Sequence, residues 1–159
     1  MSFDDWMLAL HVLSAFAFVA GIIFFWVLIL AARRIDTPDA TLRLGPLTRL
    51  ADAAIAVGAG GTIFLGVWLA FSVGNYDIWD WWILAAIALW ILATALGQRA
   101  DAAYGPAVRK AQELRAAGQT GPNAELQALN RTSNGIVLQS AISVIVLLII
   151  LDMIWKPGA

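Results

Sequence analysis

Cysteine is absent from the 159 residues, and histidine occurs only once, at position 11. Without cysteine the chain can form no disulfide, no thiolate metal site and no cysteine nucleophile. With one histidine, a single chain cannot build the zinc sites that use two or more imidazoles. These two absences exclude thiol chemistry and multi-histidine metal chemistry, and we expect no metal site.

Charge is scarce as well. Only 13% of the residues are charged and the net charge is −1, whereas a soluble domain carries about a quarter charged residues. Such a chain has no basic surface that would attract nucleic acid, so we expect no nucleic-acid partner. Hydrophobic residues make up 61% of the chain and the mean hydropathy is +0.79. A soluble fold of this size leaves much of its surface wet, so we expect the lipid bilayer to surround this one.

Four apolar stretches are long enough to cross about 30 Å of hydrocarbon. We expect the spans at about 6–32, 50–71, 81–97 and 135–155, with the third continuing as a helix beyond the membrane. In lipid every backbone group must be paired within its own segment, so these spans are helices. No repeat and no long linker divides the chain. The sequence therefore predicts an all-α membrane protein, a four-transmembrane-helix bundle that forms a single domain over residues 1–159.

Lys and Arg are unevenly distributed among the connections. Of the ten in the chain, only Lys156 lies outside the first and third connections, which leaves nine: Arg33, Arg34, Arg43, Arg49, Arg99, Arg109, Lys110, Arg115 and Arg131. Cytoplasmic loops carry this excess of cations. We therefore expect these two connections in the cytoplasm and both termini outside. Tryptophans at the expected outer boundary agree with this orientation: Trp6, Trp79, Trp81, Trp82 and Trp155.

Two features shape the connections. Thr37 followed by Pro38 is typical of a helix start, and Gly105-Pro106 is expected to kink or restart the helix that follows span three. The apolar positions Val108, Ala111 and Leu114 of that extension share one face. This face indicates either a surface helix on anionic lipid headgroups or a solvated extension of span three.

Small residues recur every four positions on the second span, at Gly58, Thr62 and Gly66. Side chains of this size at this spacing let two membrane helices approach closely. Ala93 and Gly97 on the third span look like the counterpart. We expect these five residues to form the close-packing seam of the bundle, with the Thr62 hydroxyl bonded to its own helix.

Ionisable residues inside a span are costly, and the spans contain few. His11 lies five residues beyond Trp6, roughly 7–8 Å below the boundary, and Asp152 lies at a similar depth in span four. If these spans are neighbours, His11 and Asp152 form a hydrogen-bonded polar pair that fixes the imidazole tautomer. The structural interpretation is a buried polar contact, satisfied by Asp152, a serine or a backbone carbonyl, that locks helix one to its neighbours.

The alternative for His11 is an axial ligand to haem b held between helices. Met153 is the only internal methionine at suitable depth on another helix, so it is the candidate second ligand. Met7 cannot oppose His11, because positions i and i+4 share one face of a helix. Copper bound by His11, Met7 and Met153 is chemically conceivable, but two methionines and one histidine make a poor cluster.

No P-loop, zincin motif or nucleophile elbow occurs. We therefore assign no catalytic residue, and the sequence proposes no enzyme.

Three segments carry a family resemblance. Residues 6–15 read WMLALHVLSA, residues 66–70 read GVWLA and residues 82–86 read WILAA. The first resembles the opening helix of a bacterial family of predicted integral membrane proteins, domain of unknown function 2269, whose first span has an aromatic start, Leu-His, a mid-span Gly and a basic end. The other two segments are similar to later spans of that family. The resemblance implies a multi-pass protein of a bacterial cytoplasmic membrane.

A more distant likeness links the chain to the copper-resistance D proteins and to the four-helix, haem-associated protoporphyrinogen oxidase of bacteria. These also carry a histidine early in the first helix, which matches His11. In the oxidase a lysine on a later helix accompanies that histidine, whereas span three here has only Arg99 at its end. This likeness implies haem b and porphyrin oxidation, and the missing lysine departs from it.

The leading functional hypothesis is a small non-catalytic membrane protein that self-associates as a homo-oligomer or serves as an accessory subunit of a larger membrane complex. It is motivated by the close-packing seam and by the lack of a catalytic motif. The alternative is a haem b redox protein, or an enzyme similar to protoporphyrinogen oxidase, that uses His11.

Overall fold

The computed structural model describes residues 2–72, 77 and 79–156, and within them it contains helices and no strand. The helices are α1 (Phe3–Ala32), α2 (Pro38–Arg43), α3 (Gly45–Ser72), α4 (Trp81–Ala116), α5 (Ala124–Asn130) and α6 (Ser133–Trp155). Four of them, two lengthened by the short helices before them, are long and apolar enough to cross a membrane. The predicted all-α, four-span fold class is confirmed.

Local sequence signals set several helix ends. Ser2 and Asp5 form a reciprocal capping box at the start of α1. Thr37 is the N-cap of α2 and Pro38 its first residue, as the sequence predicts. Of the two outcomes expected at Gly105-Pro106, a kink or a restart, the restart does not occur, because α4 continues through Pro106 to Ala116. Pro106 removes one backbone hydrogen bond, but the next turn of α4 is held by buried packing.

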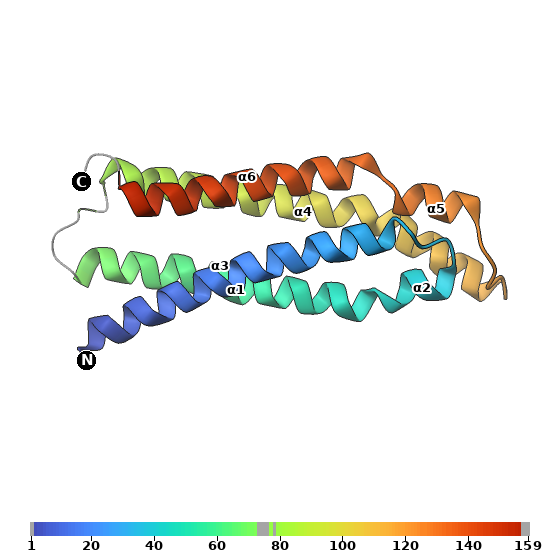
Figure 1. Cartoon of the computed structure of the whole chain (residues 1–159), viewed down its shortest axis with the longest axis horizontal. Coiled ribbons are helices and arrows are strands. Elements are labelled where there is room, and N and C mark those ends of the chain that lie inside the picture. The colour runs from blue at the N-terminus through green and yellow to red at the C-terminus, as the bar shows by residue number, and fades with distance from the viewer. Residues whose placement is uncertain (1, 73–76, 78, 157–159) are drawn as a thin grey trace.

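The four long helices form two pairs (Figure 1). α1 packs mainly along α3, and α4 packs along α6, while a smaller contact between α1 and α6 joins the pairs. α3 and α4 make few close backbone contacts, although Ala70 of α3 packs with Trp82 and Ile83 of α4. The start of α1 and the end of α6 lie at one end, hereafter the terminal end, and α2 and α5 lie at the other, the basal end.

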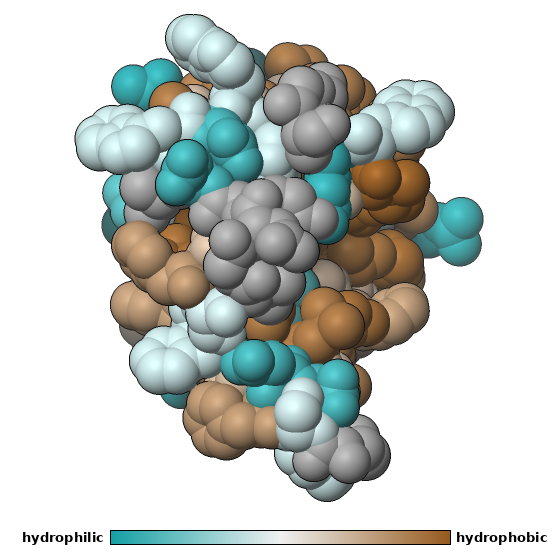
Figure 2. Space-filling view, turned by 90° about the vertical axis from the view of Figure 1, so that its left-hand side faces the viewer, coloured by the Kyte–Doolittle hydropathy of each residue, from teal (hydrophilic) through white to brown (hydrophobic). Residues whose placement is uncertain are grey.

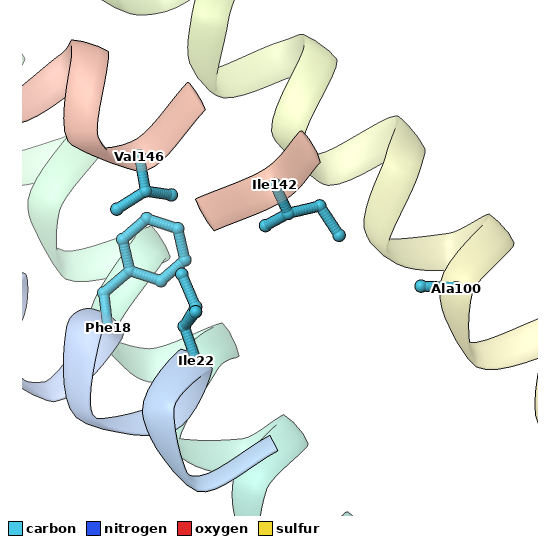
Figure 3. Packing of buried hydrophobic residues seen from close by; sticks show 5 residues of the cluster. All are labelled: Phe18, Ile22, Ala100, Ile142 and Val146. Carbon is cyan, nitrogen blue, oxygen red and sulfur yellow. The ribbon is translucent and has the colours of Figure 1, made fainter. Parts of the chain in front are cut away.

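The joint between the pairs is mostly apolar. Phe18 and Ile22 of α1 point toward Val146 and Ile142 of α6, with Ala100 of α4 beyond them (Figure 3). Two polar links cross the same joint, listed here with their distances: Trp26 Nε1 to Ser143 Oγ, 2.9 Å, and Gln139 Nε2 to the Ile22 carbonyl, 3.4 Å. Hydrogen bonds between helices add direction to packing that apolar contact alone leaves free to slide.

At the basal end α2 and α5 cover the last turns of α4. Leu126 of α5 is fully buried against Ala107, Ala111 and Leu114. The apolar face of the α4 extension is thus covered by protein, whereas Val108 is 42% exposed. Neither the lipid-surface interpretation nor the solvated one describes the buried residues Ala111 and Leu114, because a sequence pattern does not reveal which short helix folds back onto it.

Two arginines join α1 to α5 at this end. Arg33, the C-cap of α1, donates through Nη1 to the Arg131 carbonyl, and Arg131, the C-cap of α5, donates through Nε to the Arg33 carbonyl, each at 3.0 Å. A cation at a helix C-terminus satisfies carbonyls that the helix leaves unpaired and opposes its negative dipole end. Part of the cationic content of the connections therefore has a structural role.

Most of the expected tryptophan belt lies at the terminal end. Trp6, Trp79, Trp81 and Trp155 are well exposed. Figure 2, which looks onto this end, shows hydrophilic residues and residues of intermediate hydropathy around its face. Trp82 differs, because it is 6% exposed and its ring lies 5.5 Å from Lys156 Nζ. Trp82 therefore faces the bundle interior.

Candidate functional site

The glycines of α3 bring it into backbone contact with α1. A Cβ at Gly58 would lie 2.7 Å from Phe18 Cα and 2.8 Å from the Ser14 carbonyl oxygen. One at Gly61 would lie 2.9 Å from Ser14 Cβ. Only a residue without a side chain permits so close an approach.

His11 lies at the terminal end of this glycine contact. Its ring covers Gly66, where a Cβ would be 2.9 Å from Cε1 and 3.3 Å from Nδ1. The imidazole also hydrogen-bonds to the backbone of Thr62. The Thr62 hydroxyl donates to the Gly58 carbonyl at 2.7 Å, as expected from the sequence. His11 therefore locks α1 onto α3 through the contact that Gly66 leaves open.

A cavity of about 520 Å³ lies between the helix pairs at this end, and we name it the terminal cavity. All four long helices contribute to its wall. The residues used below are His11 from α1, Gly66 from α3, Trp82, Ala86 and Trp90 from α4, and Met153 from α6. Its volume falls within the range of small-molecule sites, and its wall is mainly apolar with few polar groups, as in such sites.

Charged residues of the terminal cavity lie only at its mouth. They are Asp4, Asp5 and Lys156, at the ends of α1 and α6. Asp4 accepts from the Ser72 hydroxyl at 2.6 Å, and Asp5 belongs to the α1 capping box. Both acids thus have partners within the chain, and the deep part of the cavity is uncharged.

Trp90 separates the terminal cavity from a second one of about 580 Å³, the middle cavity, and contributes to both walls. Its indole Nε1 is buried and finds no hydrogen-bond partner within residues 2–72, 77 and 79–156. A buried N–H without an acceptor costs on the order of 1–3 kcal/mol. Trp90 lines both cavities, while its Nε1 atom is itself buried.

A third cavity of about 480 Å³, the basal cavity, continues toward α2 and α5. Asp52 of α3 and Asp101 of α4 line both the middle and the basal cavities. Tyr104 lines the basal cavity and its ring fills the space beside Gly135, where a Cβ would lie 2.6 Å from Tyr104 Cε2. All three cavities are lined by residues of both α3 and α4.

The structure brings together some of the predicted site residues. His11 and Met153, the two candidate haem ligands, line the same cavity. His11 and Asp152 are not joined by a hydrogen bond: the histidine bonds to Thr62, while Asp152 Oδ2 is buried without a partner among the described residues. Gly97 faces open space and Ala93 lines the middle cavity, so neither packs against the α3 glycines.

The imidazole as placed does not present a nitrogen for metal ligation. Nδ1 is buried, and the ring edge that carries it covers Gly66. The ring is also hydrogen-bonded to Thr62. A haem iron would need His11 to rotate away from α3 and give up both contacts. Among the described residues, no three of His, Cys, Asp and Glu gather into a metal-binding group.

Comparison with known families decides the membrane assignment. Residues 6–157 match the family described as predicted integral membrane protein, DUF2269. The chain belongs to this family. As a DUF2269 member it is an integral membrane protein, and its four long apolar helices are the candidate spans. No curated protein and no solved structure matches the chain. The more distant likeness to the copper-resistance D proteins and the oxidase is not confirmed.

Several site features of this DUF2269 protein were missed at the sequence level. Trp90 lies in the middle of the third predicted span, but its place between two cavities depends on how the helix pairs diverge. Asp101 gives no signal, because it follows Arg99 in what looks like a solvated extension. In the sequence, the shared cavity wall is indicated only by the spacing of Trp82 and Trp90, which lie about two helical turns apart on one span.

Proposed function

We propose that this protein is a non-catalytic membrane protein that holds a lipid-soluble molecule in the terminal cavity. We further propose that it resides in the cytoplasmic membrane of a bacterium with both termini outside, so that the terminal cavity lies in the outer leaflet. The cavity carries the proposal: it is about 520 Å³ in volume, mainly apolar, and bordered by His11 and Trp90.

The composition of the cavity wall supports this proposal. Apolar side chains from all four long helices line the cavity, and its charged residues lie at its mouth. The buried Trp90 Nε1 lacks a partner in the described part of the chain. A polar group of this kind fixes the orientation of a ligand in an otherwise apolar site.

Self-association remains compatible with this proposal but loses its original support. The small residues Gly58, Gly61 and Gly66 contact α1 of the same chain. They are therefore covered, and a second copy could not use them without unpacking α1. No specific interaction surface among the described residues supports the accessory-subunit hypothesis, whereas the terminal cavity supports the binding hypothesis.

The orientation can be tested by cysteine labelling, since the chain has no native cysteine. We expect Asp77→Cys, between α3 and α4, to react with a membrane-impermeant maleimide on intact spheroplasts. Gln119→Cys, in the exposed turn between α4 and α5, should react only after lysis. We expect this labelling pattern because cytoplasmic loops carry an excess of Lys and Arg, and nine of the ten lie in the first and third connections. Labelling of both positions, or of Gln119→Cys alone, on intact spheroplasts contradicts the proposed orientation.

Ligand binding can be tested by filling the cavity. Ala86 is 4% exposed and lines the terminal cavity, so Ala86→Phe places a phenyl ring inside it. We expect the organic extract of the purified variant to contain about tenfold less of the co-purifying molecule, which corresponds to a loss of ~1.4 kcal/mol in binding. The control is Ala85→Phe, the same change at the neighbouring exposed position. Equal extracts from the two variants and the wild type argue against binding in this cavity.

Haem b is the alternative ligand, and the absorbance spectrum of the same purified protein tests for it. The shared cavity of His11 and Met153 favours it, whereas the contacts of the His11 ring with Gly66 and Thr62 oppose it. A Soret band in protein purified after haem-replete expression, lost in His11→Ala, would identify haem. We expect a colourless protein.

A further inference from the structure

We propose that the molecule held in the terminal cavity is a quinone: a neutral, flat ring with carbonyl oxygens and a single apolar chain. This inference rests on the proposed function and specifies its ligand class. It is derived from three properties of the cavity, namely its charge, its unpaired donor and its continuation along the bundle.

The charge pattern selects a neutral ring. The acids and the lysine of the terminal cavity stand at its mouth, and the acids are engaged with Ser72 and Ser2. Deeper in the cavity the wall consists of side chains such as Val67, Ile83, Ile87 and Ile149, with the indoles of Trp82 and Trp90. An ion placed there would lose its hydration without gaining a counter-ion. Indole faces favour a flat ring, against which they can stack.

The unpaired donor selects a ring that carries an acceptor. The Trp90 Nε1 hydrogen has no acceptor among residues 2–72, 77 and 79–156. A hydrocarbon chain in the cavity would leave this N–H unpaired, whereas a carbonyl oxygen would accept from it. A quinone carries two such oxygens and no hydrogen-bond donor. Because Nε1 is itself buried, the indole must turn toward the cavity for this bond to form.

The continuation of the cavity selects a ring with one chain. Trp90 lines the middle cavity as well, so the two spaces adjoin. The middle cavity is bordered by Phe18, Ile55, Ala59 and Ile142, and offers about 580 Å³ to an apolar chain.

The test is the affinity of purified full-length protein for decylubiquinone in phosphatidylcholine nanodiscs free of quinone. We expect saturable binding, with a dissociation constant about tenfold higher for Trp90→Phe, which removes the N–H and keeps an aromatic ring. Trp81→Phe, 80% exposed and outside the cavity wall, should bind as the wild type does. Decylbenzene, which has the chain and a ring but no carbonyl, should bind at least tenfold more weakly than decylubiquinone.

Two failures are distinguishable. If decylbenzene binds the wild type as tightly as decylubiquinone does, the cavity accepts any apolar chain; the quinone assignment is then wrong while ligand binding stands. If decylubiquinone does not bind and Ala86→Phe leaves the co-purifying molecule unchanged, the proposed function fails as well. If Trp90→Phe does not elute as a folded protein, the quinone assignment is tested by the wild type alone, through its affinities for decylubiquinone and decylbenzene.

Discussion

Gly58→Ala is expected to destabilise the bundle by about 1–3 kcal/mol or more, the range for overpacking in a well-packed interior. The added methyl would lie 2.7 Å from Phe18 Cα and 2.8 Å from the Ser14 carbonyl oxygen. Both are backbone atoms of α1, which cannot turn aside as a side chain does. α1 and α3 must therefore separate, and the contact between His11 and Gly66 along the same interface weakens with them. The measurement is the free energy of unfolding in mixed detergent micelles.

Gly60→Ala is the matched control, two residues away on the same helix. A Cβ at Gly60 meets nothing within 4 Å. Helix propensity alone predicts that either substitution stabilises α3 by about 0.5–1 kcal/mol, because glycine loses more backbone entropy than alanine. Opposite signs at positions 58 and 60 are therefore the expected result. Equal stabilisation at both positions would contradict the backbone contact between α1 and α3.

Much of this fold was predictable because its signals are local. The spans follow from runs of apolar residues, and the observed helices cover all four predicted spans. α4 continues from Trp81 to Ala116, in agreement with the predicted extension of the third span. Thr37-Pro38 marks a helix start through the geometry of two adjacent residues. The close contact of Gly58 and Gly66 is predicted in kind, since small residues at four-residue spacing indicate a helix interface.

The partner of that interface was not predictable. Gly97 repeats the small-residue signal on α4, yet a Cβ there would meet nothing, while Gly21 on α1 faces Ile55 and Ala51 of α3. Which helices become neighbours depends on how the connections fold. α2 and α5 pack on the end of α4, and that contact fixes the second pair relative to the first. The terminal cavity arises from the same placement of the two helix pairs, so no local sequence pattern predicts it.

Pro106 shows how tertiary contacts override a local signal. Gly105-Pro106 predicts a kink or a restart, but α4 continues without a restart, and Ala107 and Ala111 are almost fully buried beside Leu126. Packing on both short helices keeps the last turns of α4 helical despite the lost backbone bond. The basal end is therefore a small protein core on a membrane bundle, and its stability depends on apolar burial in water.

This difference in surroundings predicts a contrast between two leucines. Leu126 has no exposed surface, so Leu126→Ala should cost about 2–5 kcal/mol, the range for a large-to-small change in a core. The loss falls on the contact of α5 with α2 and α4, and we expect those elements to open locally while the four spans stay folded. Hydrogen exchange of α5 and proteolysis in the turn between α4 and α5 should both accelerate.

Leu147→Ala makes the same chemical change at a position of α6 that is 54% exposed. Lipid chains are as apolar as leucine, so a side chain that faces them contributes little to folding within the bilayer. We expect Leu147→Ala to leave exchange in α5 unchanged and to alter the stability of the spans only slightly. If both variants open α5 equally, or neither does, the basal end is not a separate core. α5 is then held instead by the ion pair of its Glu125 with Lys110 of α4 and by the hydrogen bonds between Arg33 and Arg131.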